Sequence, residues 1–283
     1  MRLPIKWCMN LTAYLQVLIL YLGLAVRIEW LLRRRGLTTD EKVYWERSRK
    51  LVFQRKSDFL ILFYKPFKTI EMARLATTII NLLAGLTVYR WARVLGLNEW
   101  EALTALTLYV FNPLTIYFAP RLLGESLMYF LVPLYLSLSL EGLWFPALLT
   151  LVLMMFIKPC LHQMLFTAVM QNYIMGRPLP LALFLAVPFL PISSYLKRYV
   201  YQFGLREKTL FHLALAFLST ILYFLAPSPQ QLATLILCLS YHIWFAFFVT
   251  EASIKDLIRL STPTIPGYCI MLAKILWGGC YGF

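Results

Sequence analysis

The acidic pair Asp40 and Glu41 stands in a polar segment, 27–68, that is otherwise strongly basic. The segment holds 12 of the 27 lysines and arginines but only five acids, so half of the net charge of +14 lies there. A carboxylate can act as a general base, and closely spaced lysines and arginines can hold an anionic group. The segment therefore contains the residue types that chemistry at a charged substrate requires.

The same acidic pair also has a purely structural explanation. In the sequence TTDE, Thr38 can cap a helix and Glu41, three residues later, can complete a capping box. Acidic residues also stabilise the positive end of the helix dipole. We expect a short amphipathic helix over 39–53, with Asp40, Tyr44 and Ser48 along one face. Spacing alone leaves the structural and the catalytic role of the pair equally open.

The rest of the chain has the composition of a membrane protein. Of its 283 residues, 60% are hydrophobic and 14% are charged, and the mean hydropathy is +0.69. Soluble domains contain roughly 45–50% apolar and about 25% charged residues. The basic charge therefore belongs to a membrane protein, and it does not indicate a nucleic-acid partner. The five cysteines form no CxxC pair and have no zinc spacing with histidine, so they predict no metal site.

Apolar segments long enough to cross a bilayer recur along the whole chain. A hydrocarbon core of about 30 Å needs roughly 20 apolar residues per helix, or about 17 where helices are short. Lys158 and Pro159 divide one stretch, 143–175, into two short helices or one crossing with a broken helix. We expect an all-α, polytopic transmembrane helix bundle of about nine or ten spans. The other candidate spans are 8–26, 72–89, 102–119, 122–140, 179–196, 209–226, 229–250 and 265–282.

Charged residues within apolar stretches are costly and are candidates for function. Arg121 and Glu125 are four residues apart and can pair on one helix face. Lys158 is equally compatible with a functional cation and with a surface turn beside its proline. For Lys274 we expect the ammonium group to extend to the interface. The three histidines lie in apolar runs, where a histidine is more often a hydrogen-bonded bundle residue than a metal ligand. They are His162, His212 and His242.

Residues 40–51, DEKVYWERSRKL, contain an Asp-Glu pair, a Tyr-Trp pair and a Ser-Arg pair. This run resembles the first-loop signature of GT-C glycosyltransferases, in the branch of the protein mannosyltransferases and the lipid A aminoarabinose transferases. Further elements similar to that family follow in the right order over 35–165, and this order carries the resemblance. They are Tyr64-Lys65-Pro66-Phe67, Ala73-Arg74-Leu75, Tyr89 to Gly96 with Ala102 onward, Asn112-Pro113 and Ile157-Lys158-Pro159.

The chain departs from the family pattern at several points. Phe67 stands where the family has a second proline, and the usual acid after the third helix is displaced to Glu125. We also expect the chain to lack the C-terminal soluble domain that many relatives carry. We expect one integral membrane domain over 1–283. It would consist of a basic loop with an amphipathic helix at 27–70, a GT-C-like core at 71–175 and helix hairpins at 176–283.

The resemblance implies transfer of a sugar from a polyprenyl phosphate to a hydroxyl acceptor, with inversion at the anomeric carbon. In such an enzyme Asp40 would be the general base. Glu41 would position the acceptor or hold a divalent metal, which only some branches of the superfamily use, and we assign no metal site. The leaving phosphate would be held by cations, and Tyr44 and Glu125 are further site candidates. The candidate phosphate ligands are Lys65, Lys68, Arg74, Arg121 and Lys158.

The implied partners are a polyprenyl-phosphate-linked sugar, the lipid bilayer, and an acceptor that is a protein, a lipid or a glycan. The implied location is the plasma membrane or the endoplasmic reticulum, in several membrane crossings. Two alternatives stay open: a non-catalytic scaffold subunit with the GT-C frame, and a transporter or flippase for lipid-linked anions. Orientation also stays open. The cations of the 27–68 loop, counted with those of the other loops on the same side, favour the cytoplasm for that side, whereas the family places this loop outside.

Overall fold

Helices make up all the regular secondary structure in the part of the chain that the structure describes. The computed structural model describes residues 5–34, 36–52, 58–157, 161–180, 182–183, 185, 207–248 and 261–278. The expected all-α class is confirmed for these residues. In chain order the helices are α1 (Ile5–Arg33), α2 (Thr39–Lys50), α3 (Asp58–Tyr64), α4 (Ile70–Val94), α5 (Glu99–Val110), α6 (Pro113–Phe118), α7 (Glu125–Leu140), α8 (Trp144–Met155), α9 (Leu161–Ile174), α11 (Glu207–Leu225), α12 (Pro229–Phe248), the 3-10 turn η2 (Thr262–Thr264) and α14 (Ile265–Gly278).

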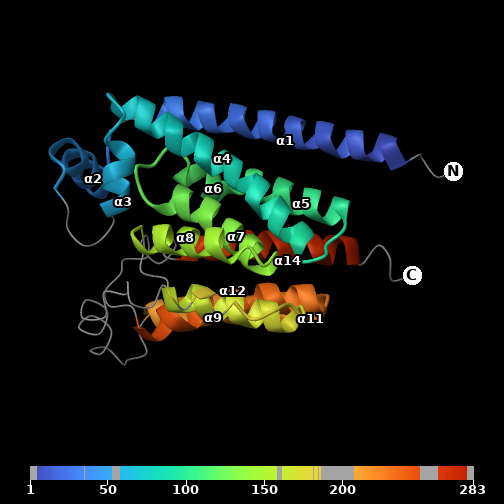
Figure 1. Ribbon diagram of the computed structural model, residues 1–283. Helices are drawn as coiled ribbons and strands as arrows, with labels where there is room; N and C mark the ends of the chain where they lie inside the picture. Colours follow the sequence, from blue (N-terminus) through green and yellow to red (C-terminus); the bar gives the residue numbers. More distant parts are fainter. Residues whose placement is uncertain are drawn as a thin grey trace.

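The longer helices lie side by side in a bundle, with α1 along one side and α9, α11 and α12 along the other (Figure 1). Helix α4 packs against α5 and α7, and these three helices contribute most of the large buried side chains of the main core. Helix α14 packs against both α5 and α12, and it therefore joins the two sides. The short helices α2 and α3 lie together at one end of the bundle, where α1 ends and α4 begins (Figure 1).

A break divides the stretch that we expected to form one helix over 102–119. Pro113 is the first residue of α6 and lacks the N–H group that would continue α5, so the i to i−4 ladder stops. Asn112 caps the new helix through its side chain. The hydroxyl of Thr115 donates to the carbonyl of Tyr109 at 2.8 Å, which replaces the hydrogen bond lost at the proline. The apolar pattern runs through this break, which is why hydropathy did not reveal it.

The stretch 143–175 contains two helices, α8 and α9, one before and one after Lys158 and Pro159 in the sequence. Helix α8 packs against α7, whereas α9 packs mainly against α12, so the two halves have different neighbours. Helix α7 begins at Glu125, three residues later than the expected span 122–140. Arg121 lies in the turn before it, so the expected shared helix face of Arg121 and Glu125 is wrong.

Two of the described helical segments, Leu11–Arg33 and Ile70–Val94, are long and apolar enough to cross a membrane. Shorter apolar helical segments accompany them, namely Glu125–Leu140, Trp144–Met155, Thr209–Leu225 and Ile265–Trp277. The expected span at 179–196 and the cation Lys158 lie outside the described residues, apart from a few positions near 180.

Candidate functional site

The predicted helix in the first loop is present as α2, and its capping box is formed as expected. The side chain of Thr38 and the side chain of Glu41 each face the backbone of the other residue, which satisfies N–H groups of the first turn. The buried face of α2 is set by Glu41 and Ser48, both fully buried. Asp40 is exposed, Tyr44 is partly buried and Ser48 is buried, so the expected row of these three side chains runs from the exposed to the buried side of α2.

The carboxylate of Glu41 accepts hydrogen bonds from two separate parts of the chain. Its Oε2 accepts from the backbone N–H and the hydroxyl of Thr38, at 3.0 and 2.8 Å, and from Nη2 of Arg34. Its Oε1 accepts from the backbone N–H of Leu122 at 2.9 Å. A buried carboxylate with both oxygens engaged fastens the start of α2 to the turn before α7.

Three arginines converge around this carboxylate. Arg34 pairs directly with Glu41, and Arg121 and Arg74 lie close enough to act on the charge of Arg34. Burial lowers the pKa of Arg34 to about 10; Glu41 opposes this shift, while Arg121 and Arg74 add to it. Arg34 is therefore still protonated at neutral pH. Three cations share this region with the carboxylate of Glu41, which favours an additional anion.

Each of the three arginines keeps a buried nitrogen that makes no hydrogen bond to the described part of the chain. These atoms are Nη1 of Arg34 and the Nε atoms of Arg74 and Arg121. Nη2 of Arg74 donates to the carbonyl of Gly36, and the Arg121 guanidinium lies 3.8 Å above the ring centroid of Tyr117. Other contacts thus fix the positions of Arg74 and Arg121, while each guanidinium of the three keeps one buried donor without a partner among the described residues.

We define the arginine cluster as Arg34, Arg74 and Arg121. Two further site candidates share with Glu41 an electrostatic effect on one buried tyrosine. Glu125 is fully buried at the start of α7, and Tyr44 is partly buried on α2. Both act on the buried phenol of Tyr64, whose hydroxyl donates to the carbonyl of Leu123 at 3.3 Å. Burial, followed by the charges of Glu125 and Glu41, raises the pKa of Tyr64 well above its usual value. Tyr64 therefore stays neutral.

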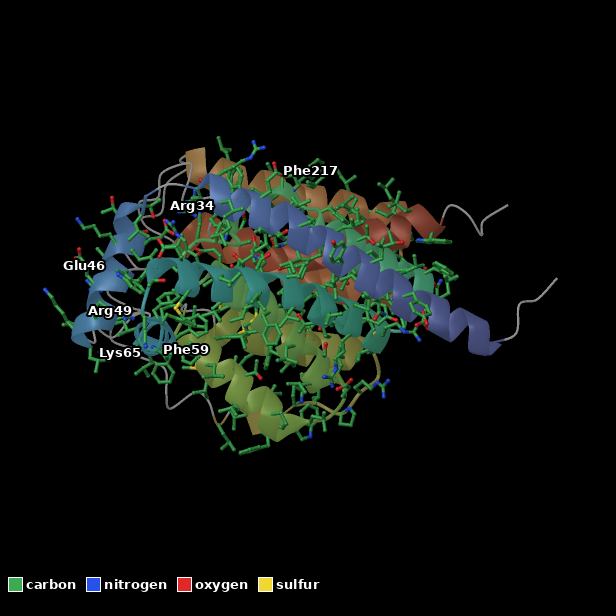
Figure 2. The ribbon with its side chains drawn as sticks, turned by 90° about the horizontal axis from the view of Figure 1, so that it is seen from above. Arg34, Glu46, Arg49, Phe59, Lys65 and Phe217 are labelled. Carbon is green, nitrogen blue, oxygen red and sulfur yellow. The ribbon has the colours of Figure 1, made fainter. Side chains whose placement is uncertain are left out.

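Two predicted phosphate ligands, Lys65 and Lys68, lie on the exposed surface around the end of α3. The ammonium of Lys65 donates to the carbonyl of Arg49 at 3.1 Å, and Arg49 donates to the carbonyls of Phe67, Tyr64 and Lys65. Arg49 thus closes the C-terminal end of α3 in the manner of a cap. Figure 2 shows Arg49 and Lys65 beside each other and apart from Arg34. Of the predicted ligands that the structure describes, Arg74 and Arg121 therefore lie near Glu41, and Lys65 and Lys68 do not.

The remaining sequence candidates lie elsewhere. Lys274 does not extend freely to the interface as we expected, because its ammonium pairs with Oε1 of Glu101 on α5 at 2.8 Å. His212 and His242 are fully buried and lie with their Nδ1 atoms 3.3 Å apart, which agrees with their interpretation as hydrogen-bonded bundle residues. The side chain of His162 lies outside the described residues.

Sequence reasoning missed Arg34 and Arg27. Arg34 belongs to a basic run at the end of the first apolar segment, and its distance of seven residues from Glu41 was the available signal. Arg27 was counted with the polar loop, yet it is fully buried in α1 and donates to Asn81, Val110 and Thr115.

Within the described residues, no group of three or more histidine, cysteine, aspartate or glutamate side chains is arranged to hold a metal ion. No protein-family model matches the chain, and no curated protein matches it.

Proposed function

We propose that this protein is a multi-pass membrane glycosyltransferase of the GT-C type, which moves a sugar from a polyprenyl phosphate to a hydroxyl acceptor. The observation that carries the proposal is the arginine cluster around Glu41. It lies where α1 ends and α4 begins, and both helices contain a described segment that is long and apolar enough to cross a membrane. A cation cluster at that boundary suits the phosphate of a lipid carrier, whose tail stays among the helices.

Large apolar side chains exposed on the outer helices support a membrane location. On α1, Tyr14, Val17 and Tyr21 follow helical spacing, and each exposes about two thirds or more of its surface. On α11, Phe217 and Phe224 are exposed to the same extent. Soluble proteins rarely expose such faces, whereas lipid covers them at little cost. The proposed bundle has about nine or ten spans, some of them shorter than a full bilayer.

The role that we propose for each residue follows from how exposed its side chain is. Asp40 is exposed in the first turn of α2 and would accept the proton of the acceptor hydroxyl. Arg34, Arg74 and Arg121 would offset the charge of the leaving phosphate. Glu41, with both oxygens engaged, would hold the site together instead of accepting a proton. Lys65 and Lys68 would contact lipid headgroups at the surface.

The proposal is tested with purified protein in nanodiscs and a set of radiolabelled polyprenyl-phosphate sugars carrying mannose, glucose or aminoarabinose. Transfer from at least one donor to a hydroxyl acceptor is expected. Replacing two of the three cluster residues, in Arg74→Gln/Arg121→Gln, should abolish transfer, whereas Arg33→Gln, at an exposed arginine outside the cluster, should not. A wild-type protein that transfers none of these sugars, and that copurifies with another catalytic subunit, would be a scaffold instead.

A further inference from the structure

We infer that Glu41 is a positioning residue, which fixes the spacing of Arg34, Arg74 and Arg121 so that their remaining donors face one phosphate. The inference deepens the proposed function and rests on it for the nature of the anion. It assigns Glu41 neither to proton transfer nor to a metal.

The first support is that the two oxygens of Glu41 join two arginine-bearing segments. Through Oε2, Glu41 accepts from Arg34 and from the two hydrogen-bond donors of Thr38, its backbone N–H and its hydroxyl. Through Oε1, it holds the N–H group of Leu122, the residue directly after Arg121. The segments are 81 residues apart in the chain, and a single buried side chain sets their separation.

The second support is that Arg74, on α4, binds the same segment of backbone that Glu41 holds. Its guanidinium donates to the carbonyl of Gly36, which lies between Arg34 and Thr38 in the segment that Glu41 holds. All three arginines are therefore tied to one short stretch of backbone, either directly or through Glu41. A shift of this stretch would move the three guanidinium groups relative to one another.

The third support is that these contacts require a carboxylate of this length. A glutamine side chain has one oxygen and one NH₂ group in place of two oxygens. Its NH₂ group, itself a donor, would then face a backbone N–H donor and could not accept from it. Glutamine would therefore keep the capping box or the Leu122 contact, but not both. Aspartate keeps the charge but is shorter by one methylene group, so it cannot reach both segments.

The inference and simple electrostatics predict opposite changes in anion affinity when the charge of Glu41 is removed. Glu41 places a negative charge beside a proposed anion site, and removing a like charge should strengthen anion binding. If Glu41 positions the arginines, removing its charge should weaken binding, because the guanidinium groups lose their common geometry. The two roles are therefore separated by the direction of the change.

The experiment measures the affinity of farnesyl monophosphate for the purified full chain in phosphatidylcholine nanodiscs, with farnesol as the uncharged reference. For Glu41→Gln we expect farnesyl phosphate affinity to fall by about tenfold or more, since charge-assisted hydrogen bonds are lost, with farnesol binding unchanged. The matched control is Glu46→Gln, which removes an exposed carboxylate from the same helix and should leave the affinity unchanged. Equal or tighter binding by Glu41→Gln would overturn the inference.

A second variant covers the case in which Glu41→Gln does not fold. Glu41→Asp keeps the charge, so simple electrostatics predicts an unchanged affinity, whereas positioning predicts a loss similar to that of glutamine. An unchanged affinity in Glu41→Asp would overturn the inference, as would a wild-type protein that does not bind farnesyl phosphate. Wild-type binding without sugar transfer would refute the proposed function and leave the positioning role in place.

Discussion

Nη1 of Arg27 in α1 donates a 2.8 Å hydrogen bond to the carbonyl oxygen of Val110, the last residue of α5. The same guanidinium donates to Asn81 on α4 at 3.0 Å and to Thr115 on α6 at 3.2 Å. The carbonyl of Val110 has no partner within α5 because the helix stops before Pro113. A buried arginine thus satisfies the backbone at the break and joins α1 to three other helices.

Replacing Arg27 with methionine should lower the free energy of unfolding by roughly 2 kcal/mol, because buried acceptors on α4 and α5 lose their donor. Arg27→Lys should have an intermediate effect, since one ammonium cannot reach all of these acceptors. Thermal unfolding followed by tryptophan fluorescence measures both. Arg33→Gln, which removes only an exposed pair with Glu29, is the control. Equal melting temperatures for the wild type and Arg27→Met would contradict this role.

Gly23 lies one helical turn before Arg27, where α1 meets α5. A Cβ added at this position would overlap Cγ1 of Val110, and it would also lie 3.2 Å from Cδ1 of Leu82. Gly23→Ala should therefore lower the melting temperature, and the smaller side chain of Val110→Ala should partly restore it in the double variant. A double variant that is no more stable than the sum of the single effects predicts would show that the contact is not the cause.

Asp40→Asn tests the proposed base directly. Loss of a general base should reduce the rate of sugar transfer by about 10²–10⁴-fold at saturating donor. Asp40 is exposed, so the melting temperature and the affinity for farnesyl phosphate should change little. Rates are compared with those of Glu46→Gln on the same helix. Full transfer activity in Asp40→Asn would remove this residue from the mechanism.

Glu101 and Lys274 join α5 to α14 at the end of the bundle opposite α2. Oε1 of Glu101 accepts from Lys274 at 2.8 Å, and Oε2 accepts from the backbone N–H of Asn98 at 2.8 Å, which completes a capping box. Glu101→Ala should therefore be more destabilising than Lys274→Ala, by about 1 kcal/mol, since only the former also removes the cap. Unfolding of both variants and of the double variant checks this order. Equal losses would mean that the cap contributes nothing.

Local patterns predicted local structure well. The capping box at Thr38 and Glu41 depends on residues three positions apart, and it formed as expected. The break at Asn112-Pro113 was present in the sequence as a proline, but the apolar residues on both sides concealed it. Lys274 shows the opposite limit, because its partner Glu101 lies 173 residues away.

The candidate site was predicted only in part, because it too depends on residues that are far apart in the chain. Residue type and order suggested Arg74 and Arg121, and both lie near Glu41. Lys65 has the same charge, but its position at the end of α3 directs it to the carbonyl of Arg49. Arg34 was overlooked because only the packing of α1 and the first loop shows that it faces inward. Such packing depends on tertiary contacts and not on spacing along the chain.

Helix α2 has only 12 residues, and isolated helices of that length are marginal in water. Its first turn is held through Glu41 to the backbone of Leu122, and its last turn through Arg49 to the backbone that follows α3. The backbone groups that Glu41 and Arg49 bind, in Leu122 and Phe67, both lie outside α2. A peptide excised over 36–52 would therefore be mostly unstructured in water, and the shape of this segment is a property of the assembled bundle.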